Sequence, residues 1–175
     1  MTSATGFGAS KSMTPIGWLG LPMLACAIAT VLLATPIRIF GLGLPEPVFP
    51  LALAFAWAVI RPSVLAPFLL ILLGVFLDFL WGGPTGLWGL ALVAAYGLTL
   101  AVRPTLTGRG PVVLWIWYGA ACLLAFGVGV LITFVRTGEI PNPLSLGWQA
   151  FITILLYPLA GRLIARYEDA DVRFR

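Results

Sequence analysis

Residues 74–89 read GVFLDFLWGGPTGLWG, and the interpretation of the whole chain depends on this stretch. Asp78 is the one acidic residue inside a strongly apolar run. Gly82, Gly83 and Pro84 form the tightest turn signal in the sequence. Long apolar segments lie on both sides. The stretch therefore predicts two apolar helices joined by a very short turn, with a carboxylate near the end of the first helix.

The composition indicates a protein embedded in a membrane. The 175 residues are 61% hydrophobic and 9% charged, and the mean hydropathy is +1.05. Soluble domains carry about 25% charged residues. A chain of this size has too much surface for its volume to hide so many apolar side chains from water. We therefore expect an all-α integral membrane protein, with about six transmembrane helices in one compact bundle.

Six apolar segments are separated by proline, glycine and charged residues. A helix of roughly 20 residues crosses a bilayer, so each segment is interpreted as a span and the transmembrane domain covers residues 16–161. Pro84 is expected in the first turn of the fourth helix, and Arg103 and Pro104 just after its end. The expected spans are residues 16–35, 48–60, 63–81, 84–102, 112–135 and 144–161.

The second span is the least defined, because residues 48–60 are short for a crossing. Two interpretations stay open. The helix begins earlier, near Ile39, or it is a tilted or partly re-entrant element.

Basic residues predict the orientation of the spans. Residues 1–15 are expected to be a cytoplasmic segment that leads into an uncleaved first span, and residues 162–175 a cytoplasmic tail. With six crossings, eight lysine and arginine residues then lie on the cytoplasmic side, and two, Arg38 and Arg136, lie outside. The positive-inside bias favours this arrangement and places the turn after Asp78 on the outer side of the membrane.

The residues needed for most enzyme chemistry are missing. The chain has no histidine, and its two cysteines, Cys26 and Cys122, lie in apolar segments. No Ser/His/Asp set, phosphate-binding glycine loop or pair of carboxylates is present. Arginines are scattered at segment ends and form no nucleic-acid-binding patch. We therefore expect no enzymatic activity, cofactor, metal or nucleic-acid partner.

Asp78 has a structural and a functional interpretation. A charge at the bilayer centre costs about 2.5–3.5 kcal/mol, and less near the interface. In the structural interpretation, Asp78 accepts hydrogen bonds from the free N–H groups around Thr85 and Gly86 at the start of the next helix. In the functional one, it contacts a partner subunit or acts in transport or catalysis. The structural interpretation is favoured, and the others stay open.

Small residues at four-residue spacing mark helix faces that can pack closely. Packing within the chain is favoured over contact with another chain, which remains the alternative. The candidate positions are Ala25 and Ala29 on the first span and Ala121, Ala125 and Gly129 on the fifth.

The spacing G-x₃-D-x₃-G-x-P-x-G, together with six spans in a chain of this length, resembles the rod shape-determining protein MreD family. Residues 47–62, PVFPLALAFAWAVIRP, also look like the second span of that family. The specific part of the resemblance covers residues 47–89. Its signature positions are Gly74, Asp78, Gly82, Gly83, Pro84 and Gly86.

The resemblance implies a non-enzymatic scaffold of the bacterial inner membrane. It would belong to the cell-elongation complex and maintain rod shape by binding MreC and supporting lateral peptidoglycan synthesis. Further implied partners are MreB, RodA and a class B penicillin-binding transpeptidase.

The family is also similar in fold to the substrate-binding subunits of energy-coupling-factor transporters, in which an AxxxA on the first span meets a transmembrane partner. Ala25 and Ala29 match that pattern. A small-molecule-binding transporter subunit is therefore the alternative function.

Overall fold

The computed structural model describes residues 15–33, 38–39, 42–43, 46–60, 62–106 and 108–172. Its helices confirm the expected helical bundle, and one antiparallel pair of two-residue strands, β1 (Arg38–Ile39) and β2 (Leu42–Gly43), precedes the second helix. The helices are α1 (Pro15–Leu33), α2 (Phe49–Ile60), α3 (Leu65–Trp81), α4 (Leu87–Leu106), α5 (Pro111–Thr137), α6 (Pro143–Leu155) and α7 (Tyr157–Val172).

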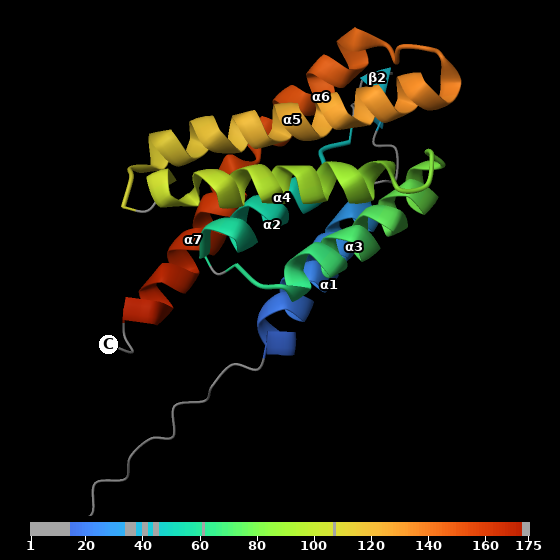
Figure 1. Cartoon of the computed structure of the whole chain (residues 1–175). Coiled ribbons are helices and arrows are strands. Elements are labelled where there is room, and N and C mark those ends of the chain that lie inside the picture. The colour runs from blue at the N-terminus through green and yellow to red at the C-terminus, as the bar shows by residue number, and fades with distance from the viewer. Residues whose placement is uncertain are drawn as a thin grey trace, which may run out of the picture.

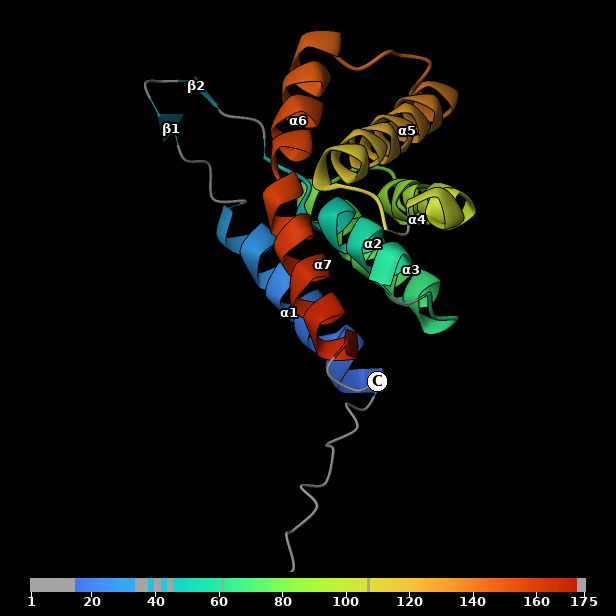
Figure 2. The ribbon, with the colours of Figure 1, turned by 90° about the vertical axis from the view of Figure 1, so that its left-hand side faces the viewer.

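The connections between helices gather at two ends of the bundle. The α3–α4 and α5–α6 connections lie at one end, and the α4–α5 connection and the end of α7 lie at the other (Figure 1). α4 packs against α3, α5 and α2. In the view turned by 90°, α5 and α6 diverge toward the loop that joins them (Figure 2).

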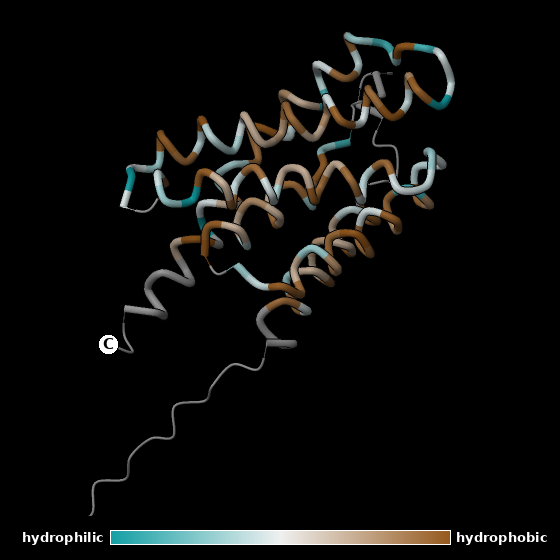
Figure 3. Tube along the Cα trace, in the orientation of Figure 1, coloured by the Kyte–Doolittle hydropathy of each residue, from teal (hydrophilic) through white to brown (hydrophobic). Residues whose placement is uncertain are grey.

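Three stretches are long and apolar enough to cross a membrane: Leu87–Leu106, Pro111–Thr137 and Pro143–Arg162. The last includes α6 and the first turns of α7. The apolar segments of α1, α2 and α3 are shorter. Apolar residues run along the helices, and the most hydrophilic positions concentrate in the connections (Figure 3). The fold is therefore that of a helical membrane protein.

Two expected spans differ from the structure. The range 84–102 is wrong at both ends. Gly86 has a φ of 92°, which interrupts the helical backbone, so Pro84 lies in the turn and α4 begins at Leu87. α4 then continues through Arg103 and Pro104, because a proline this close to a helix end removes only one late backbone bond.

The sixth expected span, residues 144–161, matches the apolar stretch Pro143–Arg162, but this stretch is interrupted and forms two helices rather than one. The chain breaks at Leu156, and α7 continues past residue 162 to Val172. The expected amino-terminal segment lies outside the described residues except for Pro15.

α2 lies at the centre of the bundle although it is the shortest helix. Residues 50–58 are all buried, and α2 contacts α1, α3, α4, α5 and α7. It does not start near Ile39, which belongs to β1. Its 12 residues span about 18 Å, whereas the hydrocarbon core is about 30 Å thick. At least one end of α2 therefore needs hydrogen-bond partners from the protein itself.

Other helices supply those partners. At the start of α2, the Val48 N–H donates to Thr153 Oγ1 over 3.2 Å, and Pro50 has no N–H to satisfy. At its end, Arg103 Nε donates to the Val59 carbonyl at 3.1 Å, and Arg103 Nη2 to that of Ile60 at 3.4 Å. Side chains of α6 and α4 thus cap a helix that is too short to reach both interfaces.

We predict that Thr153→Val destabilises the protein by about 1–3 kcal/mol, because it leaves the buried Val48 N–H without an acceptor. Thr99→Val is the matched control. Thr99 is also buried, but its hydroxyl bonds only to the Ala95 carbonyl of its own helix. Thermal unfolding of the purified proteins in detergent measures the difference. Equal losses for the two variants would contradict the capping role.

Candidate functional site

The turn between α3 and α4 is built on glycines with a left-handed backbone. Gly82 has a φ of 64° and ends α3, and Gly86 has a φ of 92°. Glycine adopts these angles without the steric penalty that a Cβ atom would bring. The Asp78 carbonyl accepts the N–H groups of Gly82 and Gly83, the latter at 3.0 Å. This pairing closes the end of α3.

The Asp78 side chain caps the start of α4. One carboxylate oxygen, Oδ2, accepts the Gly86 N–H at 2.6 Å, and the other, Oδ1, accepts the Trp88 N–H at 3.0 Å. The capping interpretation is confirmed, with Trp88 as the second donor in place of Thr85. A carboxylate at a helix start is stabilised by the N–H groups that have no partner inside the helix and by the helix dipole. At 1% exposure, Asp78 does not reach the surface.

Two glycines let α3 and α4 touch through their backbones. A Cβ atom on Gly74 would overlap the backbone of Gly89 and Trp88. A Cβ atom on Gly89 would lie 3.5 Å from the Ile71 carbonyl oxygen, an ordinary contact distance. Gly74 is therefore the position where the two helices meet, and the hairpin is fixed by Gly74 along its length and by Asp78 at its turn.

A polar cluster ties this hairpin to the rest of the bundle. Trp81 Nε1 donates to Glu46 Oε2 at 2.7 Å, and Gln149 Nε2 donates to the Glu46 carbonyl at 3.0 Å. Trp81 and Trp88 pack edge to face, with ring centroids 5.1 Å apart. The sequence spacing indicates no role for Glu46 or Gln149, because these contacts join residues 35 and 103 positions apart.

The two stripes of small residues have different surroundings. Ala121 and Ala125 on α5 are buried, and a Cβ atom on Gly129 would lie 3.5 Å from Leu87 Cδ2 of α4. The α5 stripe thus packs within the chain, as favoured. On α1, Ala25 is exposed and Ala29 is half-buried. The α1 stripe therefore lies toward the outside of the bundle.

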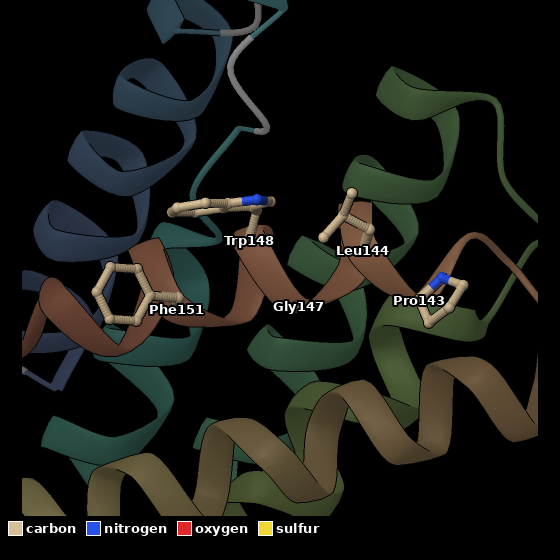
Figure 4. A pocket seen from close by; sticks show the side chains of 5 residues that line it. All are labelled: Pro143, Leu144, Gly147, Trp148 and Phe151. Atoms are coloured by element: carbon tan, nitrogen blue, oxygen red, sulfur yellow. The ribbon is translucent and has the colours of Figure 1, made fainter.

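Two apolar hollows lie along α6. The first, of about 380 Å³, opens on the surface, and its side chains come from successive turns of α6 (Figure 4). The second, of about 120 Å³, lies between α4, α5 and α6. Small-molecule sites usually combine 300–1,000 Å³ with a few converging polar groups. The first hollow is lined by Pro143, Leu144, Gly147, Trp148 and Phe151, and the second by Leu87, Trp88, Phe126, Gly129, Val130, Thr133, Pro141 and Leu146.

Polar side-chain groups are few in these linings: the indole N–H of Trp148 in the first hollow, and the indole N–H of Trp88 and the hydroxyl of Thr133 in the second. The only side-chain hydroxyl in the second hollow, that of Thr133, donates to the Gly129 carbonyl of its own helix. In the part of the chain that the structure describes, no three of the residue types His, Cys, Asp and Glu lie close enough to hold a metal ion.

Comparisons with known protein families, with curated proteins and with solved structures found no match to this chain. A functional interpretation therefore rests on the geometry of the hairpin and its surroundings.

We predict that Gly74→Ala destabilises the hairpin and that Gly89→Ala is much better tolerated. The alanine methyl at residue 74 meets backbone atoms that cannot rotate away, and overpacking of this kind costs about 1–3 kcal/mol. The two variants add the same group on opposite sides of one contact. Unfolding temperatures in detergent compare them directly. A larger loss for Gly89→Ala would contradict the close approach at Gly74.

Substitutions of Asp78 test the cap at the start of α4. Asp78→Leu leaves the N–H groups of Gly86 and Trp88 unpaired and costs about 1–3 kcal/mol. Asp78→Asn keeps one acceptor oxygen and loses one of the two bonds, so its loss is expected to be smaller, near 1 kcal/mol. Chemical unfolding in mixed micelles ranks the variants. A loss for asparagine equal to that for leucine would show that the charge, rather than the pairing, is what matters.

Proposed function

We propose that this protein is a non-enzymatic scaffold of the bacterial inner membrane that binds MreC within the cell-elongation complex and supports lateral peptidoglycan synthesis. The observation that carries the proposal is the α3–α4 hairpin. The positions on which the resemblance to the MreD family rests work together in one joint. Gly74 permits the helix contact, Asp78 caps α4, and Gly82 and Gly86 supply the left-handed turn.

The polar residues of the described chain support a scaffold over an enzyme. Asp78, Glu46, Gln149 and Thr153 all hold backbone groups or an indole of this chain. Exposed apolar helix faces are available for contacts outside the chain. The exposed face of α1 presents Leu21, at 72% exposure, and its neighbours to the bilayer or to another transmembrane helix.

We propose that the chain crosses the membrane six times, with residues 1–15 and 162–175 in the cytoplasm. Two observations support this topology. The α3–α4 and α5–α6 connections share one end of the bundle, opposite the α4–α5 connection and the end of α7 (Figure 1). α2 also has partners for both its ends inside the protein, so it can lie within the bilayer despite its length.

The proposed scaffold function also implies a set of partners. MreC spans the membrane once, so an exposed helix face suits it. MreB, RodA and a class B penicillin-binding transpeptidase would join through the larger complex.

The alternative function is a small-molecule-binding subunit of an energy-coupling-factor-type transporter. The exposure of Ala25 on the outward side of α1 favours it, because such a subunit needs a close helix contact with its transmembrane partner. The apolar lining of both hollows weighs against it, since a vitamin requires converging polar groups.

Crosslinked copurification from native membranes tests the proposal. We expect MreC to be recovered with the wild-type protein, and depletion of the protein to produce rounded cells with reduced wall insertion along the side wall. Gly74→Ala is expected to reduce recovery of MreC, and Gly89→Ala to retain it at equal protein level.

Intact rod shape after depletion would overturn the proposal. Recovery of an ATPase module and a bound vitamin, in place of MreC, would establish the alternative.

A further inference from the structure

α6 is attached to the bundle unevenly along its length. Of its 13 residues, only Ala150 and Thr153 are buried. Among the described residues, no hydrogen bond joins the outer half of α6, residues 143–148, to another helix. All the side-chain bonds that tie α6 to its neighbours come from residues 149–154. The attachment is therefore concentrated at the inner end of the helix.

The junction between α6 and α7 is a break with its own set of partners. Pro158 has no N–H, so the Ile154 carbonyl loses its usual donor in the next turn. Trp115 Nε1 of α5 donates to that carbonyl at 3.3 Å. Tyr118 Oη, also of α5, donates to the Thr153 carbonyl at 3.0 Å. The two carbonyl groups next to the break therefore have hydrogen-bond donors, and both donors come from one short stretch of α5.

One side-chain bond lies farther out along α6. Gln149 Nε2 donates to the Glu46 carbonyl at 3.0 Å, seven residues before the break at Leu156. Beyond that bond, α5 and α6 diverge (Figure 2), and Leu146 of α6 lines the hollow of about 120 Å³ between them.

We infer that α6 is a hinged segment that pivots at Leu156 and is held against the bundle by the Gln149–Glu46 hydrogen bond. When that bond opens, the outer end of α6 moves away from α5 and the hollow beside Trp88 widens toward the bilayer. The bonds of Thr153 and Ile154 lie within one turn of the pivot and survive a small rotation. A rotation of about 20° displaces the Leu144 end, roughly 18 Å from the pivot, by about 6 Å. This inference rests on the contacts of α6 and is independent of the proposed function.

Distances between spin labels test the hinge in the full-length protein reconstituted in lipid nanodiscs. The labels are placed at Val135→Cys on α5 and Leu144→Cys on α6, both exposed, in a background carrying Cys26→Ala and Cys122→Ala. For this protein we expect two distance populations about 6 Å apart. Gln149→Met, which removes the donor at similar size, is expected to enrich the longer population. Ser145→Ala, on the unattached half of α6, is the matched control and is expected to leave the populations unchanged.

Pro158→Ala tests the pivot separately. It restores a backbone N–H that can bond the Ile154 carbonyl, so the longer population is expected to shrink. A single narrow distance that Gln149→Met leaves unchanged would overturn the hinge. A longer population that Pro158→Ala does not reduce would overturn its placement at Leu156.

Discussion

The structure depends on one constraint: a backbone N–H or C=O group at a helix end needs a partner, and inside a bilayer the protein must supply it. α2 is the clearest case, because it is too short to bring both ends to water. Thr153 and Arg103 meet its two ends from other helices. Asp78 does the same for α4, accepting from N–H groups eight and ten residues further along the chain. Two of the polar side chains buried in the described part of the chain, Asp78 and Thr153, are thus used to close helix ends.

Local features of the fold were accessible to sequence reasoning, and distant ones were not. The glycine turn and the capping by Asp78 follow from residues within one hairpin, where spacing limits the geometry. The central place of α2 had a readable sign as well, since a helix that is apolar on every side is buried all round. The contacts Val48–Thr153 and Glu46–Gln149 join residues 105 and 103 positions apart. No spacing rule connects such residues, because their meeting is decided by how the helices pack. The break at Leu156 had a sign in Pro158, but its stabilisation by Trp115 and Tyr118 depends on α5.

The contacts made within the hairpin and along α5 determine which residues remain available to a partner. Asp78 is engaged in the turn, and the α5 stripe is engaged with α4, so neither is available to a partner. Exposed apolar side chains lie on α1, α3, α5 and α6, and such faces suit lipid or another transmembrane helix.

The hydrogen bond between Val48 and Thr153 also joins two residues that are synthesised at different times. A ribosome adds about 5–20 residues per second, so the 105 residues between the two partners take about 5–20 s to produce. During that interval α2 has one end without its acceptor, in a medium that offers none. Until α6 has been made, water or the insertion machinery must accept a hydrogen bond from the Val48 N–H at the start of α2. The bond between Val48 and Thr153 can therefore form only after α6 has been synthesised.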